Sequence, residues 1–242
     1  MTTMRAVVAG IAVAFLMSAC ATTTDAPVKP AAAGDKGGSG FLGKDYALLT
    51  PGEVSKGQAG LRYFNPAAQW RQYSKIIVDP VTFWGDETGK VSPADQQALS
   101  TYFNGSLEKA LSEKFQVVTQ PAPGVVKLQL AVVDAEAATP GLRTISMVVP
   151  QARLLTTVGS MASGKQVFAG ALQVETRLID AASGKLLAAA VARSVGGSSI
   201  KTAAQWEWGD AQNAMDDFSK RAAVNLYALT SGAATPAQLP VQ

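Results

Sequence analysis

The chain has 242 residues, of which 48% are hydrophobic and 16% are charged, with a formal net charge of +3. This length suits one domain with a substantial core or two small ones, and the charge forms no basic stripe for nucleic acid. Histidine is absent, and the only cysteine is Cys20. Histidine-dependent catalysis and zinc or copper sites are therefore excluded in their usual forms, and we expect no cofactor.

The N-terminus has the layout of a secretory signal peptide. Arg5 and the amino terminus are positive, residues 6–17 are uncharged and apolar, and two small residues precede Cys20. The apolar run is too short to cross a bilayer, which takes about 20 residues, and no later apolar stretch reaches that length, so we expect no transmembrane helix in the mature protein. "MSAC" resembles a bacterial lipobox, whose cysteine is acylated. Ordinary cleavage after Ala21, which would discard Cys20, is the alternative.

Lipidation of Cys20 would anchor the protein to a membrane outside the cytoplasm. One acyl chain holds a protein only marginally, whereas the three chains of lipoproteins of this type make the anchor effectively permanent. Ala21 follows the cysteine, where an Asp tends to retain Gram-negative lipoproteins at the inner membrane. The lipobox resemblance therefore implies the periplasmic face of the outer membrane.

We divide the chain into four parts: a signal peptide at 1–19, the lipidated cysteine and a flexible tether at 20–40, a single periplasmic domain at 41–232, and a flexible tail at 233–242. The tether is rich in Ala, Thr, Gly and Pro and has no apolar periodicity. Such a segment cannot bury enough surface to offset the entropy lost on ordering. The tail is polar and contains proline.

The first half of the domain predicts one strand and one long helix. Residues 41–72 read mostly as loop with short turns, and "KIIVDPVTFW" at 75–84 reads as a strand with a bulge or edge at Pro80. Ser92 is a good N-cap, followed by proline at the first helical position, and the helix should end near Lys114. Its apolar face comprises Leu99, Phe103, Leu107, Ala110 and Leu111.

The second half predicts three long elements. "VVKLQLAVVDAEA" alternates as a strand after the short strand "FQVVTQ", and "QVFAGALQVETRLID" with "KLLAAAVARSV" reads as a hairpin. Residues 139–165 are less legible, with a short helix expected from Pro150. The last helix should run from about Trp208 to Leu229 and stop at Gly232. The order predicts a two-layer α+β domain, a mixed or antiparallel sheet with helices mainly on one face and the other face partly open.

Several segments carry a family resemblance. "SGFLGKDYALLTPG", "LRYFNPAAQWRQYSKIIVDPVTFW", "VVKLQLAVVDAEAATP", "VVPQARLL" and "LIDAASGKLLAAAVARSVGG" together resemble the bacterial lipoprotein family called domain of unknown function 3313 (DUF3313). The similarity covers about residues 39–230 in addition to the lipobox. It implies a lipoprotein with an α+β domain and carries over no active-site residues.

Two motifs resemble a nucleotide-binding loop and a pair of catalytic or Ca²⁺-binding carboxylates, but both have simpler interpretations. Residues 159–166, "GSMASGKQ", nearly match a phosphate-binding loop, but Gln166 replaces the hydroxyl that holds Mg²⁺ and a strand follows, so we expect no nucleotide. Asp134 and Glu136 share one face of a strand, as paired catalytic or Ca²⁺-binding carboxylates would. At the end of a strand such residues are more often solvated.

Four residues are candidates for binding a partner or ligand. Asp79 lies within an apolar run, so it needs hydrogen-bond partners if it is buried, and its simplest role is to anchor a bulge. Trp84, Trp206 and Trp208 are aromatic residues that suit a glycan or protein surface if they are exposed, and core packing is the simpler interpretation.

No catalytic constellation appears, so we expect a protein that is not an enzyme. The first hypothesis is an envelope lipoprotein that binds a protein or peptidoglycan partner. The alternatives are a carboxylate-dependent envelope hydrolase and a carrier for a small apolar ligand in a pocket under residues 139–165. Convergent acidic groups in a cleft would favour the hydrolase, an apolar cavity the carrier, and an exposed aromatic patch the partner-binding protein.

Overall fold

A computed structural model of the protein describes residues 24–28, 39–84, 91–136, 171–195 and 208–240. Within these residues, nine strands form one mixed sheet in the order β2-β3-β9-β8-β7-β4-β6, and β1 and β5 pair with β9 and β7 outside that path. The strands are β1 (Thr24–Ala26), β2 (Thr50–Pro51), β3 (Leu61–Phe64), β4 (Lys75–Val78), β5 (Thr82–Phe83), β6 (Gln116–Val117), β7 (Val125–Glu136), β8 (Ala171–Asp180) and β9 (Leu186–Val195). The helices are α2 (Pro93–Ser112), α6 (Gly209–Ser231) and the short 3₁₀ turns η1 (Gly43–Leu48), η2 (Val54–Lys56), η3 (Trp70–Gln72) and η4 (Pro236–Gln238).

The sheet has an antiparallel centre and a parallel side. β7, β8 and β9 pair antiparallel over most of their length, whereas β4 and β5 pair parallel with β7, and β6 pairs parallel with β4. Helix α2 makes the crossover from this parallel side, since it lies between β5 and β6 in the chain. The predicted mixed α+β fold is confirmed.

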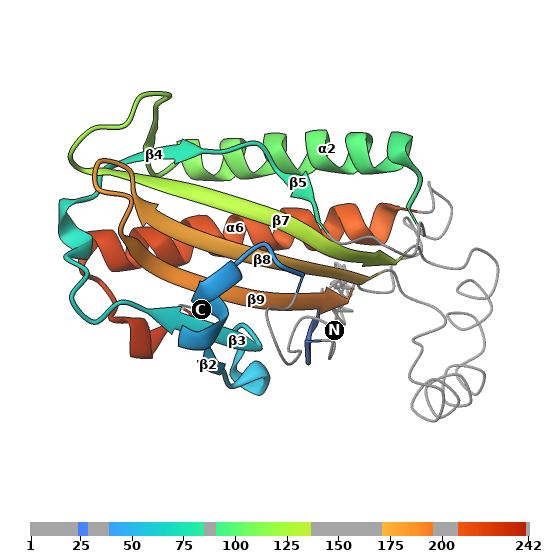
Figure 1. Cartoon of the computed structure of the whole chain (residues 1–242), viewed down its shortest axis with the longest axis horizontal. Helices are drawn as coiled ribbons and strands as arrows, with labels where there is room; N and C mark the ends of the chain where they lie inside the picture. Colours follow the sequence, from blue (N-terminus) through green and yellow to red (C-terminus); the bar gives the residue numbers. More distant parts are fainter. Residues whose placement is uncertain (1–23, 29–38, 85–90, 137–170, 196–207, 241–242) are drawn as a thin grey trace, which may run out of the picture.

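The two long helices cover one face of the sheet, behind the strands in Figure 1, and build the main core. Side chains on alternate positions of β7 and β8 meet α2 and α6 there, because successive strand residues point to opposite faces. The rings of Phe103 on α2 and Phe218 on α6 join the two helices by an edge contact at 5.7 Å between centroids. Buried members of this core include Leu99, Leu107, Leu128, Leu130, Val174 and Met215.

Helix α2 begins, and helix α6 ends, at the residues that the sequence predicts. The hydroxyl of Ser92 accepts a hydrogen bond from the backbone N–H of Asp95 at 3.2 Å, and Pro93 opens α2. Gly232 ends α6 in the left-handed conformation, with φ of 76°, which favours glycine. The predicted apolar face of α2 is confirmed, since Leu99, Phe103, Leu107 and Leu111 are its buried residues.

The opposite face of the sheet is covered in part by a second, smaller core. Residues 39–49, which include η1, cross in front of β9 in Figure 1. Leu42 is buried against Ala189 and Val191 of β9. The expectation of mostly loop in 41–72 is wrong at β2 and β3, because β3 pairs both with β2, its neighbour in the chain, and with β9, which lies far away in the sequence.

Two described segments near the ends of the chain are more ordered than their composition predicts. Thr24–Ala26, inside the predicted flexible tether, form β1 by pairing with Arg193–Val195 of β9. In the predicted flexible tail, a capping box between Thr235 and Gln238 opens η4, and Leu239 is buried in the main core. Both predictions are corrected at these residues, because backbone pairing and burial against distant segments supply the stabilisation that the segments lack alone.

We expect Ser92→Ala to lower the free energy of unfolding by about 1 kcal/mol, because it removes the side-chain cap of α2. Urea denaturation measures this change. Ser112→Ala is the matched control at the other end of the same helix, where the hydroxyl only donates to the Lys109 carbonyl at an exposed position. Equal effects of the two substitutions would contradict the assignment of Ser92 as the cap.

Candidate functional site

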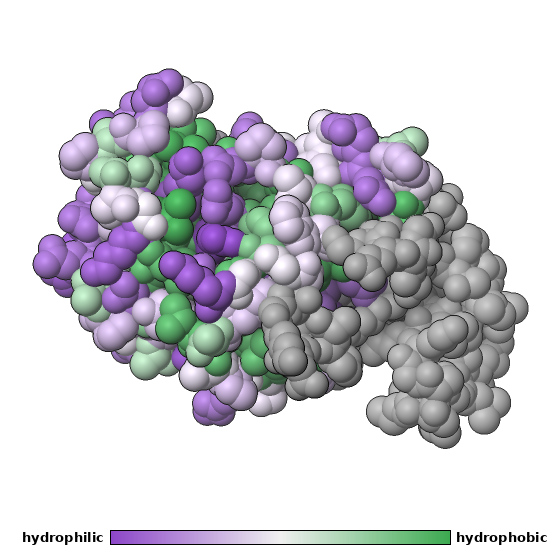
Figure 2. Space-filling view, in the orientation of Figure 1, coloured by the Kyte–Doolittle hydropathy of each residue, from purple (hydrophilic) through white to green (hydrophobic). Residues whose placement is uncertain are grey.

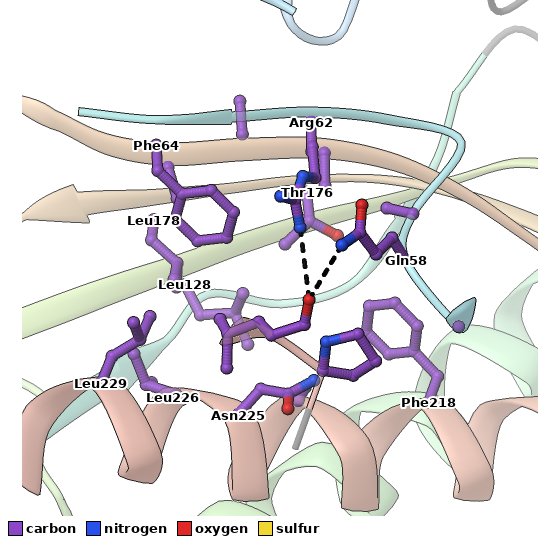
Figure 3. Close-up of a pocket in the computed structure, with 18 of the residues that line it drawn as sticks. Gln58, Arg62, Phe64, Leu128, Thr176, Leu178, Phe218, Asn225, Leu226 and Leu229 are labelled. Carbon is purple, nitrogen blue, oxygen red and sulfur yellow. Dashed lines mark hydrogen bonds between the residues drawn. The ribbon is translucent and has the colours of Figure 1, made fainter. Parts of the chain in front are cut away.

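An apolar pocket of about 180 Å³ lies between the sheet and helix α6 (Figure 3). Its floor comes from β3, β8 and β9, its opposite wall from α6, and its rim from the turn after η2 and from the C-terminal segment. The residues that line it include Gln58, Arg62, Phe64, Leu128, Thr176, Leu178, Ala188, Ala190, Phe218, Ala222, Asn225, Leu226, Leu229, Leu239 and Pro240.

The pocket exists because strand β9 presents small side chains to α6. Ala188, Ala190 and Ala192 occupy alternate positions, so they share the face of β9 that looks toward the helix. At the Ala188 end of this row, the residues paired with β9 on the neighbouring strands are large: Phe64 of β3 and Leu178 of β8 flank Ala188. Alanines at these positions leave a gap between sheet and helix that longer side chains would fill.

The C-terminal segment closes part of the pocket. The carbonyl oxygen of Leu239 accepts hydrogen bonds from Gln58 Nε2 at 3.2 Å and from Arg62 Nη1 at 3.4 Å, as Figure 3 shows. Gly57 follows η2 with φ of 77°, and a Cβ there would lie 3.2 Å from Pro240 Cγ. Glycine therefore lets the turn approach the C-terminal segment closely.

A second cavity of about 170 Å³ adjoins the first one and is more polar. The two share Gly57, Gln58, Ala59, Phe218, Ala222 and Asn225. The polar cavity is crossed by an ion pair between Asp25 Oδ2 and Arg221 Nη1 at 2.6 Å, with Ser194 beside it. Together the two cavities form a site with an apolar inner part and a charged outer part.

The arrangement suits binding better than acid–base chemistry. None of the described residues that line the apolar pocket carries a carboxylate, and Asp25 in the adjoining cavity is paired with Arg221. Among the described residues, no group of three or more acidic or cysteine side chains lies close enough to hold a metal ion. An apolar cavity of roughly 150 Å³ stays dry and binds a benzene-sized molecule, so this one has room for a small apolar ligand.

A buried polar cluster lies on the other face of the sheet, under residues 39–49. Glu175 of β8 is fully buried and accepts hydrogen bonds from Ser39 Oγ at 2.9 Å and from the Tyr46 hydroxyl. Burial and the bond to Glu175 raise the pKa of Tyr46 to about 12, so it stays a neutral donor. Because both donors belong to the segment that covers Glu175, this cluster attaches that segment to the sheet.

Arg177 strengthens the same attachment. Its guanidinium donates to the Phe41 carbonyl, lies 3.7 Å from Asp45, and sits 5.1 Å from the centre of the Phe41 ring. The sequence places Gln173, Glu175 and Arg177 on one face of a strand, opposite the apolar face, and this alternation is confirmed. That face is not open to water here, because η1 and its flanking residues cover it.

Two of the predicted site residues have polar partners near the parallel side of the sheet. Asp79 accepts a hydrogen bond from Gln129 Nε2 at 2.8 Å and lies 3.8 Å from Lys127 Nζ, so it joins the β4–β5 bend to β7. Trp84 is 44% exposed, and its indole N–H donates to the Ser39 carbonyl at 2.7 Å. Neither residue lies at the pocket between β9 and α6.

The other candidates are buried or lie outside the described residues. Trp208 is 3% exposed and belongs to the main core, and its indole N–H has no hydrogen-bond partner among the described residues. Asp134 follows a β-bulge in β7 and pairs with Gln173 of β8. The predictions that fall outside the described residues concern Cys20, Trp206, the loop-like motif at 159–166, the 139–165 segment and the side chain of Glu136.

Sequence reasoning did not find the pocket. The signal that was present is the run of alanines in "KLLAAAVARSV", which indicates a strand with too little side-chain volume to fill the space under a helix. The expected pocket under residues 139–165 falls on undescribed residues. The residues of the rim carry no local signal, because Gln58 and Arg62 are 181 and 177 positions from Leu239.

Comparison with known proteins assigns the chain to a family. The family model "Protein of unknown function (DUF3313)" matches residues 38–222. The chain belongs to this family. It is 27% identical over 186 residues to the "Uncharacterized lipoprotein YdcL" of Escherichia coli K12, which covers 76% of this chain and 79% of YdcL. The same identity and coverage hold for YdcL of E. coli O157:H7. DUF3313 membership confirms the predicted resemblance.

Two solved structures are distantly similar to this chain in fold. The PelC dodecamer from Paraburkholderia phytofirmans gives a TM-score of 0.36 at 13% identity, covering 66% of this chain and 92% of that one. Protein XCC0632 from Xanthomonas campestris gives a TM-score of 0.40 at 14% identity, covering 70% and 91%. Among the described residues, no helix has the length and apolar character that a membrane span requires.

We expect Tyr46→Phe to lower the free energy of unfolding by about 1–3 kcal/mol, because buried Glu175 loses a hydrogen-bond donor. Chemical denaturation measures the loss. Tyr63→Phe is the matched control, since this tyrosine packs against the same smaller core and its hydroxyl makes no hydrogen bond among the described residues. A Tyr46→Phe protein as stable as Tyr63→Phe would rule out the polar attachment.

Proposed function

We propose that this DUF3313 protein is a non-enzymatic envelope lipoprotein, anchored by lipid on Cys20, whose domain binds a small apolar ligand between β9 and α6. The pocket of about 180 Å³ carries the proposal. Its walls are mostly aliphatic and aromatic side chains, with a few polar groups at the rim, as in sites for small apolar ligands. Of the functions considered from sequence, the carrier is the one that such a cavity favours.

The anchor and the pocket are close along the chain. The homologous YdcL is described as a lipoprotein, which supports export and membrane attachment of this chain. Cys20 precedes Thr24 of β1 by four residues, a reach of at most about 14 Å. Asp25, the next residue, lines the polar cavity. Lipid on Cys20 would therefore hold this side of the domain near the membrane surface, and Ala21 favours the outer membrane.

A protein or peptidoglycan partner at Trp84 is the second candidate function. The ring of Trp84 is held in an edge contact with Phe41, 5.9 Å between centroids, while almost half of its surface stays exposed. A fixed, exposed aromatic side chain suits a binding hot spot. Over the described part of the face turned forward in Figure 2, hydrophilic and hydrophobic residues are intermixed. Trp84 therefore supports a partner-binding function less strongly than the pocket supports ligand binding.

We expect Ala190→Leu to weaken binding of octan-1-ol, a neutral apolar probe, at least about tenfold, because the added isopropyl group occupies the pocket. Isothermal titration calorimetry measures the affinity on the full chain carrying Cys20→Ala. The protein is purified without detergent, since detergent would compete for an apolar site.

Ala110→Leu is the matched control for this experiment. Ala110 is a half-buried alanine on α2 that packs against the main core but lines no part of the pocket. It should leave the affinity unchanged, and Ala222→Leu on the α6 wall should repeat the loss. If wild type binds no octan-1-ol, or if both filled variants bind it as wild type does, the ligand-binding proposal is wrong.

We expect Cys20→Ala to move the protein from the membrane fraction to the soluble fraction, because it removes the only thiol that can carry lipid. Fractionation with immunodetection measures the distribution, and labelled palmitate on the wild-type chain but not on the variant identifies the modification. Ser18→Ala is the control, since it changes a neighbouring small residue and keeps the cysteine. A Cys20→Ala protein that stays with the membranes would exclude the anchor.

A further inference from the structure

The C-terminal segment occupies the rim of the pocket in a way that indicates what the pocket recognises. The side chain of Leu239 is buried in the main core, and its carbonyl oxygen accepts hydrogen bonds from two side chains. One donor is the amide of Gln58 and the other is the guanidinium of Arg62. The protein therefore already holds an apolar group attached to an oxygen acceptor at this place.

Both donors are oriented by other contacts. The amide oxygen of Gln58 accepts a hydrogen bond from the Glu53 backbone N–H at 2.9 Å, which turns the Nε2 group toward the rim. The guanidinium of Arg62 lies 5.7 Å from the centre of the Phe64 ring, on the helix-facing side of β3. Two donors held in this way are preorganised, so a ligand acceptor would bind them with little loss of side-chain entropy.

The charge of Arg62 favours an acid over a neutral acceptor. Within the described part of the chain, no carboxylate lies within ion-pair distance of Arg62, whereas Arg221 is paired with Asp25 and Arg177 lies beside Asp45. The carbonyl of Leu239 is neutral, so its hydrogen bond with Arg62 is not an ion pair. Hydrogen bonds between guanidinium and carboxylate are shorter and stronger than those to a neutral carbonyl.

We propose that the ligand of this pocket is a monocarboxylate with an unbranched apolar tail, of the fatty-acid class. Its carboxylate takes the place of the Leu239 carbonyl between Gln58 and Arg62, and its tail lies along the alanines of β9 toward Leu178 and Leu229. The C-terminal segment competes with the ligand for the same donors. This inference rests on the proposed function and adds the chemical class of the ligand.

The experiment compares two probes with the same number of carbons, octanoate and octan-1-ol, by isothermal titration calorimetry. It uses the full chain with Cys20→Ala, without a further substitution and with either Arg62→Met or Arg71→Met. We expect wild type to bind octanoate about tenfold more tightly than octan-1-ol, since the acid gains charge-assisted hydrogen bonds. Arg62→Met should abolish this preference and keep the affinity for octan-1-ol, which also shows that the variant is folded.

Arg71→Met separates a specific contact from a general effect of positive charge. Arg71 is exposed on η3 and lines neither cavity, so we expect its loss to leave the preference for octanoate intact. Equal affinity for acid and alcohol, or a preference that survives Arg62→Met, would overturn the fatty-acid inference while leaving the apolar pocket in place. Failure of both probes to bind wild type would instead overturn the proposed function.

A second arm distinguishes a free acid from the acyl ester of a lipid. Methyl octanoate keeps the tail and the carbonyl and lacks the charge. We expect it to bind as weakly as octan-1-ol. If methyl octanoate binds as tightly as octanoate, the carboxylate is not what Arg62 recognises, and the proposal of an acid is wrong.

Discussion

Strand β9 packs against a different core on each of its two faces, and most of the structure depends on this double packing. Its residues alternate between the main core under α6 and the smaller core under η1, because successive side chains point to opposite faces. Ala189 and Val191 are closely covered on one side. On the other side, Ala188 and Ala190 leave volume that α6 does not fill, and the pocket is the result.

The edge of β9 also brings the two ends of the chain together. β3 pairs with its first half and β1 with its last residues, so the N-terminal and central segments share one edge of the sheet. From there Asp25 reaches Arg221 on α6, and Gln58 and Arg62 reach Leu239. The same pairing thus places β1, the pocket rim and the C-terminal segment side by side.

The two faces of the domain have different kinds of stabilisation. The helix-covered face is held by apolar packing, in which Phe103 and Phe218 join the helices. The other face carries a fully buried carboxylate, Glu175, whose desolvation is offset by the donors of Ser39 and Tyr46. A polar attachment of this sort fixes one position of the covering segment, whereas apolar packing around the β9 alanines leaves an unfilled cavity.

The sequence by itself determined the parts that follow from local periodicity: the cap and apolar face of α2, the alternation of the β8–β9 hairpin, the stop of α6 at Gly232 and the family. It did not determine β1, β3 or η4, because each is stabilised by a partner far away in the chain. Only the tertiary structure decided that the alanines of β9 border a pocket and that Arg62 meets the carbonyl of Leu239. The physical reason is that a cavity and its rim are set by the volumes and positions of residues from distant segments, which no single stretch of sequence records.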